Sequence, residues 1–203
     1  MKRSFFNPED GLWRTVMAVA NVMILSVLWA ICSLPIFTLG PATSALYVGV
    51  KNHVRPMEDG AIRTFFVSFK ENFTKGAIMG TMEILFFLAL CWATWIIYQM
   101  ATFGNGLAEV LYYCALMIIF FIIGIISYSF PTLGRFEYGV IDCLKMSMTL
   151  GILHLPSTII LAAIVILSAY SVYLVWLMVV FVPALAALFS SFILERIYER
   201  HTD

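Results

Sequence analysis

The chain has 203 residues, of which 62% are hydrophobic and 12% are charged, and its mean hydropathy is +0.95. A soluble domain of this length cannot bury that much apolar surface, so the composition excludes a soluble globular protein and places the chain in a lipid bilayer. The formal net charge is zero, which by itself favours neither an acidic nor a basic partner.

Four apolar runs are long enough to cross a hydrocarbon core, which takes about 20 helical residues. The last run is about twice that length, and Tyr170, Ser171 and Tyr173 interrupt it, so it predicts two helices joined by a tight turn. The first run continues past Ser33 and is longer than the core of a secretory signal, so we expect it to be retained. These runs predict an all-α membrane protein, a polytopic bundle of five transmembrane helices in a single domain over residues 1–203. The expected spans are residues 16–34, 77–101, 110–130, 148–169 and 173–194.

Lysine and arginine occur in only some of the segments between these runs. Residues 102–109 and the turn around Ser171 contain none, and the other connecting segments are basic. Because cytoplasmic loops are enriched in Lys and Arg, we expect the two basic-free loops to face outward and the C-terminus to be cytoplasmic. The basic residues that give this orientation are Lys51, Arg55, Arg63, Lys70 and Lys75 before the second span, Arg135 and Lys145 between the third and fourth, and Arg196 and Arg200 after the fifth.

The N-terminal charges do not fit a simple count of spans. A single crossing over residues 16–34 would place Lys2, Arg3 and Arg14 outside, against their charge preference. The apolar segment 35–50 is short and begins with helix breakers at Pro35, Gly40 and Pro41, so it predicts a broken or re-entrant element with a half-helix over residues 41–50. This element would return the chain and leave the N-terminus cytoplasmic. The alternative is a plain five-span protein with the N-terminus outside.

An amphipathic helix is expected at residues 60–75, before the second span. Phenylalanines recur at helical spacing, with Phe65 beside a stripe of Phe66, Phe69 and Phe73, while Lys70 lies among the charged residues of the other face. This pattern is typical of a helix in the inner headgroup region of a membrane, where the rings are buried and the cations meet anionic lipid. A helix packed on the protein's own cytoplasmic surface fits the pattern equally well.

Two ionisable residues fall inside predicted spans and are candidate functional groups. Glu83 lies in the second span and His154 in the fourth, at similar depths. If the two helices adjoin, the pair forms a site that senses or carries a proton; alternatively, each side chain is satisfied locally. The sequence contains no phosphate-binding loop and no hydrolase or nucleic-acid motif, and its four cysteines are widely spaced. We therefore expect no enzyme activity, no cofactor, no metal and no nucleic-acid partner.

Three segments carry a resemblance to a known family. They are LPIFTLGPATSALY at residues 34–47, which includes Pro35, Gly40, Pro41 and Tyr47; FFVSFKENF at residues 65–73; and FPTLGRFEYGVIDCLKMSMTLGILHLP at residues 130–156. Together they resemble the YesL-like family of small bacterial integral membrane proteins. Members typically occur in Gram-positive bacteria beside genes for carbohydrate uptake and polysaccharide degradation. The resemblance implies a non-catalytic accessory or assembly subunit of a carbohydrate ABC importer in the bacterial cell membrane, with the permease and its ATPase as partners.

A candidate partner-contact loop lies between the third and fourth spans. It comprises Arg135, Glu137, Asp142 and Lys145, and it is expected on the cytoplasmic side. The spacing of residues in this loop partly matches the loop through which ABC permeases contact their ATPase, although Cys143 replaces the glycine of that loop. The alternative is a chance similarity. The competing function is a stand-alone small-solute or proton-coupled transporter or channel that uses Glu83 and His154.

Overall fold

The computed structural model describes residues 11–54, 60–104, 106–136 and 138–202, and it describes side chains for residues 16–52, 60–104, 106–136 and 138–199. Every regular element in these ranges is helical, which confirms the predicted all-α class. In chain order the elements are α1 (Gly11–Cys32), η1 (Ile36–Thr38), α2 (Leu39–Gly49), η2 (Val50–Val54), α3 (Ala61–Glu71), α4 (Phe73–Thr102), α5 (Gly106–Arg135), α6 (Val140–Leu153), α7 (Leu155–Leu174), η3 (Trp176–Val180) and α8 (Val182–Thr202).

Three of the described helices, α4, α5 and α7, are long and apolar enough to cross a membrane. Helices α4 and α5 contain the predicted spans 77–101 and 110–130. Helix α1 offers a shorter apolar stretch, Val16–Cys32, and α8 carries Glu195, Arg196 and Glu199 in its second half. The structure thus confirms a helical membrane protein with three candidate spans, and it does not establish the predicted count of five.

The last apolar block is divided differently from the prediction. The expected span 148–169 runs across a helix junction at His154, because Pro156 has no N–H and fits only the first turn of a new helix, α7. The expected turn at Ser171 is wrong, since α7 continues to Leu174 and the chain turns at residues 175–181. The Ser171 hydroxyl donates to the Leu167 carbonyl at 2.7 Å, so this polar side chain is satisfied inside the helix.

The segment predicted as a half-helix, residues 41–50, is a central element of the fold. It forms α2 and runs into η2, which has π-helical geometry. In the turn before it, the Thr38 hydroxyl lies 2.6 Å from the Cys32 carbonyl and 2.7 Å from the Pro35 carbonyl. Pro35 is exposed in this turn, whereas Gly40, Pro41 and Tyr47 are buried. Helix α2 packs against α1, α3, α4, α5 and α8.

The predicted amphipathic helix 60–75 is two elements. Helix α3 ends at Glu71, and Phe73 begins α4, with Asn72 between them. On α3, Phe65 is fully buried against α1 and α2. Phe66 is exposed, and Phe69 is half-buried. Lys70 is exposed. Phe65 thus packs α3 on the protein's own helices, and contact of the exposed Phe66 with the lipid headgroup region stays a prediction.

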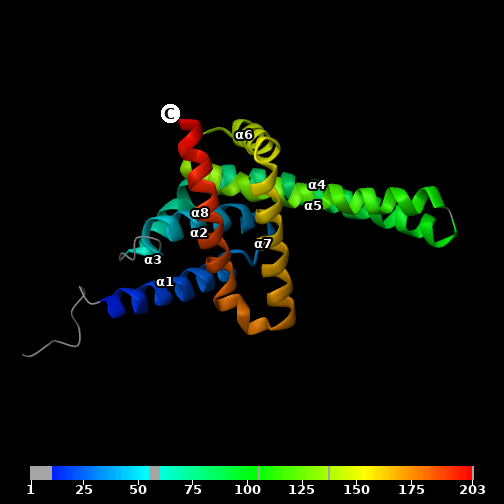
Figure 1. Ribbon diagram of the computed structural model, residues 1–203. Helices are drawn as coiled ribbons and strands as arrows, with labels where there is room; N and C mark the ends of the chain where they lie inside the picture. Colours follow the sequence, from blue (N-terminus) through cyan, green and yellow to red (C-terminus); the bar gives the residue numbers. More distant parts are fainter. Residues whose placement is uncertain (1–10, 55–59, 105, 137, 203) are drawn as a thin grey trace, which may run out of the picture.

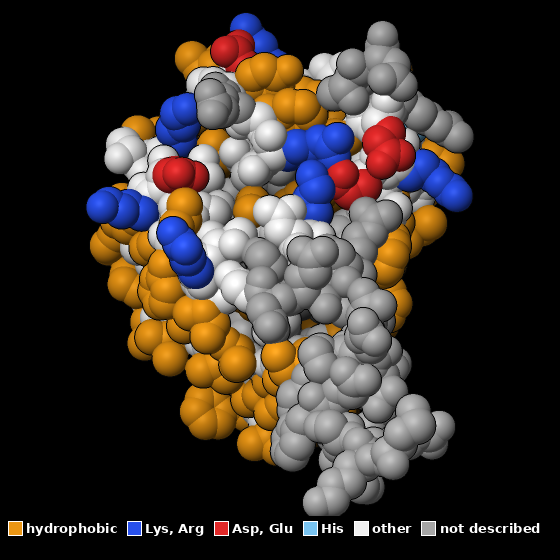
Figure 2. Space-filling model, turned by 90° about the vertical axis from the view of Figure 1, so that its left-hand side faces the viewer, with side chains coloured by type: hydrophobic (Ala, Val, Ile, Leu, Met, Phe, Trp, Pro, Cys, Tyr) orange, Lys and Arg blue, Asp and Glu red, His pale blue; other side chains and the backbone are white. Residues whose placement is uncertain are grey.

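The helices do not run along one common direction. Helices α4 and α5 form a hairpin that extends away from the rest of the protein, and α7 and α8 run across it (Figure 1). Seen from the side opposite the hairpin tip, Lys, Arg, Asp and Glu side chains gather on the upper part of the surface, and hydrophobic side chains cover the part below (Figure 2). One end of the molecule is therefore polar.

Substitution of Gly76 by Ala tests the crossing of α2 and α4. A Cβ atom at this position would lie 2.8 Å from the Pro41 nitrogen and 2.9 Å from its Cα atom, so the two backbones must move apart. We expect Gly76→Ala to lower the free energy of unfolding by about 1–3 kcal/mol, measured as thermal unfolding in detergent. Gly106→Ala is the control, because nothing lies within 4 Å of its added Cβ. Equal stability of the two variants would contradict the close crossing.

Candidate functional site

A buried carboxylate at the polar end joins three distant parts of the chain. Glu195 of α8 is 5% exposed. The Tyr47 hydroxyl of α2 donates to its Oε1 at 2.7 Å, and the Lys51 Nζ of η2 lies 3.2 Å from the same oxygen. The Arg135 guanidinium, at the end of α5, pairs with its Oε2. We call Tyr47, Lys51, Arg135 and Glu195 the Glu195 cluster.

A second layer of contacts fixes the Arg135 side chain. Its guanidinium carbon lies 5.2 Å from the ring centroid of Tyr198 and 5.6 Å from that of Phe136, which are cation–π distances. The hydroxyls of Tyr198 and Thr132 are 2.9 Å apart and share a hydrogen bond. Both Tyr198 and Thr132 are fully buried. A second buried contact between α5 and α8 therefore lies next to the cluster and stabilises the position of Arg135.

The cluster controls the charge of Glu195. Burial alone would raise the pKa of this carboxyl, but the Arg135 guanidinium, the Tyr47 hydroxyl and the Lys51 ammonium together hold the pKa below its usual value of 4.5. Glu195 is thus a carboxylate at neutral pH. Two cations face one anion, so the cluster carries a net positive charge.

The sequence contains a partial signal for this cluster, which our prediction did not use. Tyr47 and Lys51 are four residues apart, and this spacing places them on one helical face. Glu195 directly follows the apolar part of α8, at a position that resembles an ordinary solvated helix end. No local pattern shows that Tyr47 and Lys51 meet Glu195, which is 148 residues from Tyr47.

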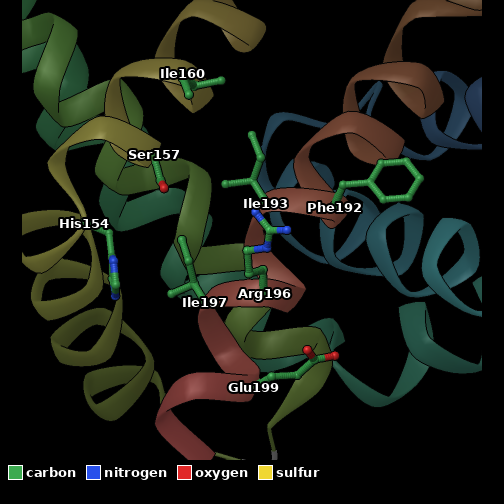
Figure 3. A pocket seen from close by; sticks show the side chains of 8 residues that line it. All are labelled: His154, Ser157, Ile160, Phe192, Ile193, Arg196, Ile197 and Glu199. Atoms are coloured by element: carbon green, nitrogen blue, oxygen red, sulfur yellow. The ribbon is translucent and has the colours of Figure 1, made fainter.

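Glu83 and His154, predicted as a possible pair, line two different cavities. His154 is half-buried at the α6–α7 junction and lines a cavity of about 600 Å³ between α7 and α8. Figure 3 shows Ser157 of α7 and Arg196 of α8 beside the space between the helices, with Glu199 further along α8. Apolar side chains from α7 and α8 complete the wall. Because Glu83 is absent from this cavity, the structure gives no support to a joint proton site.

Glu83 lines a larger and mostly apolar cavity of about 680 Å³. Helices α1, α2, α4, α5, α7 and α8 all contribute to its wall. The Glu83 side chain is 9% exposed, and its carboxylate accepts a hydrogen bond from Ser129. Within the described part of the chain, its Oε2 has no hydrogen-bond partner. Glu83 is therefore an incompletely satisfied acid inside the helical body.

The predicted partner-contact loop does not act as one surface. Arg135 points into the Glu195 cluster, whereas Asp142 and Lys145 are exposed on α6. Glu137 lies outside the described residues. The contact surface that remains is thus the exposed face of α6. Among the described residues, no three His, Cys, Asp or Glu side chains lie close enough together to hold a metal ion.

Replacement of Glu195 by Gln removes the anion from the cluster. Lys51 and Arg135 would then face each other without a counter-charge, and both reach solvent in part, with side chains 30% and 18% exposed. We expect Glu195→Gln to lower the free energy of unfolding by about 2 kcal/mol, measured by thermal unfolding in detergent. Glu199→Gln, one turn later and exposed, is the control and is expected to change stability by less than about 0.5 kcal/mol.

The same cluster predicts a pH dependence. The pKa of Glu195 is lowered in the folded protein, so its stabilisation is fully present above the unfolded value of 4.5 and is lost as the pH falls through the folded value. We expect the stability difference between wild type and Glu195→Gln to shrink as the pH is lowered from about 6 to about 3. A difference that stays constant over this range would argue against a depressed pKa.

Comparisons with known proteins found one family match and one similar protein. Residues 22–93, which run from α1 through most of α4 and include Tyr47 and Lys51, match the family described as "Protein of unknown function, DUF624". An uncharacterized protein of Bacillus subtilis (strain 168), YteU, is 21% identical over 154 residues; the match covers 73% of this chain and 66% of YteU, just under two thirds of that protein. No solved structure matches the chain. Both matches support membership of the YesL-like DUF624 family of small bacterial membrane proteins, which the three sequence motifs resemble.

Proposed function

We propose that this protein is a non-catalytic accessory or assembly subunit of a carbohydrate ABC importer, and that its α4–α5 hairpin contacts the membrane-embedded permease. The observation that carries the proposal is the exposure of the hairpin. Both helices are long enough to span a membrane, yet only 6% of each apolar window is buried within the chain. The carbohydrate importer is what the family resemblance implies.

The hairpin offers a large surface for a partner. It extends beyond the other helices (Figure 1), so its far half packs only within itself. Exposed aromatic residues occur on both helices, among them Trp92 and Trp95 on α4 and Tyr113 on α5. Helices associate in lipid through close packing and interhelical hydrogen bonds rather than through hydrophobic burial, so an exposed pair of spans suits docking against the spans of another protein.

The proposed topology has five spans, with α1 and α8 crossing in addition to α4, α5 and α7, and with both termini in the cytoplasm. The Glu195 cluster supports it. Lys51, Arg135 and Glu195 come from three connecting segments that the charge pattern assigns to one side, and their side chains meet at one end of the molecule. Because such basic segments are retained in the cytoplasm, we assign this end to the inner face, where the exposed Asp142 and Lys145 of α6 are available to the ATPase.

The alternative is a stand-alone transporter or channel that uses Glu83 and His154. It requires the two residues to share one pathway, and they line separate cavities. No other observation in the described residues favours transport over assembly. We therefore prefer the accessory role.

Native cysteines allow a direct test of the hairpin contact. Cys91 of α4 and Cys114 of α5 are exposed, while Cys32 is half-buried and Cys143 is buried. A membrane-permeable, thiol-reactive photocrosslinker in cells that express the importer should join this 22.9 kDa chain to the permease. Mass spectrometry identifies the adduct, and the Cys91→Ser, Cys114→Ser double variant is the control. Capture of lipid or of a second copy alone would contradict the proposal.

Cysteine labelling tests the topology. In a Cys91→Ser, Cys114→Ser background, Asn52→Cys places an exposed thiol next to Lys51, and Phe103→Cys places one in the connection between α4 and α5, where Phe103 is 89% exposed. We expect a membrane-impermeant maleimide to label Phe103→Cys in intact cells and Asn52→Cys only after permeabilisation. Labelling of Asn52→Cys in intact cells would overturn the assignment of the inner face.

A further inference from the structure

We infer that the cavity around Glu83 binds a hydrophobic amine, with the ammonium group of the ligand paired to the Glu83 carboxylate and its apolar part filling the remaining space. The cavity volume of about 680 Å³ lies within the usual range of small-molecule sites, which are largely apolar and have few polar groups. The cavity lies among α4, α5 and α7, the three candidate membrane spans. A ligand of this class partitions into lipid, the phase that surrounds membrane-spanning helices.

Glu83 supplies the polar anchor. Its side chain is more than nine-tenths buried, and Ser129 satisfies only part of its hydrogen-bonding capacity. Its Oε2 is buried and has no partner among the described residues. A buried carboxylate without a cation is costly inside a membrane, and such residues mark binding sites and pathways. An ammonium group provides both the opposite charge and the missing hydrogen-bond donor.

Most of the other polar side chains of the cavity already have hydrogen-bond partners within the protein, and Ser190 adds one further hydroxyl to the wall. Thr43, Ser127 and Ser168 each donate to a backbone carbonyl four residues earlier, at 2.7, 2.8 and 2.6 Å. The Trp29 indole donates to Thr43 at 3.1 Å, and the Tyr47 hydroxyl donates to Glu195. A sugar would lose water from many hydroxyls here without finding enough partners. The chemistry selects a ligand with one cationic group and an apolar remainder.

Aromatic rings in the wall favour a cation over a neutral polar group. Trp29, Phe87 and Phe130 line the same cavity as Glu83. A ring face within about 6 Å attracts an ammonium group, and the attraction is larger where water is excluded. Glu83 and these rings together therefore discriminate an amine from an alcohol of the same shape.

The test uses the full chain in phosphatidylcholine nanodiscs and a matched pair of probes, 1-naphthylmethylamine and 1-naphthalenemethanol. These probes share one ring system and differ in the amine or hydroxyl group. We expect wild type to bind the amine at least about tenfold more tightly than the alcohol, as measured by native mass spectrometry. Glu83→Gln should abolish this preference. The control, Glu109→Gln, removes a carboxylate from an exposed position on α5 and should retain it.

Three outcomes would overturn the inference: equal binding of the two probes to wild type, a preference that survives in Glu83→Gln, or an equal loss in Glu109→Gln. If Glu83→Gln does not fold, the wild-type protein still decides. A photoreactive analogue of the amine must then label cavity residues of α4 or α5 such as Phe87, and labelling confined to the exposed hairpin tip would refute the site. Selective binding of glucose in place of the amine would also refute it.

Discussion

The ion pairs of Glu195 hold the polar end of the fold together. A carboxylate that is 5% exposed is tolerated because two cations and one hydroxyl satisfy its two oxygens. These partners come from α2, η2 and α5, so a single side chain of α8 fixes three helical elements at once. The π-helical turn of η2 carries Lys51, and such turns often occur where a helix bends to place a side chain.

The protein contains two buried glutamates whose environments differ. Glu195 is close to the end of the apolar region and has a complete set of partners. Glu83 is inside the helical body and has one hydroxyl. The Glu195 cluster already uses Tyr47, which lines the same cavity as Glu83, whereas the buried Glu83 Oε2 has no hydrogen-bond partner among the described residues. This difference supports a structural role for Glu195 and the binding role that we infer for Glu83.

The hairpin and the cavity occupy different parts of the molecule. The cavity lies where α4 and α5 pass the other helices, and the hairpin extends beyond it. A permease docked on the hairpin therefore leaves the cavity walls from α1, α2, α7 and α8 in place. Since α4 and α5 contribute to both, a ligand beside Glu83 contacts the same two helices that the proposed partner would touch.

Several features follow from local sequence. The long apolar runs of α4 and α5 and the helical class depend only on composition and length, so they are visible without a structure. A separate helix follows α1 as expected, but of the predicted breakers only Pro35 precedes it, since Gly40 and Pro41 lie in the first turn of α2. The turn expected at Ser171 is absent. The sequence shows a polar residue in an apolar run, which resembles a turn, but it does not show that the Ser171 hydroxyl donates a hydrogen bond to a carbonyl of its own helix. His154 lies in an otherwise apolar stretch, so residue composition does not show that α6 ends at Leu153 and α7 begins at Leu155.

The sequence by itself determined the membrane class, the family resemblance and the location of the basic segments, since each rests on residue type and order along the chain. Only the tertiary structure decided what those residues contact. It paired Arg135 and Lys51 with Glu195, separated Glu83 from His154, and placed Gly76 of α4 against Pro41 of α2. These contacts depend on how helices that are distant in sequence cross. Hydrophobic periodicity indicates which face of a helix is apolar, but it does not indicate which other helix packs against that face.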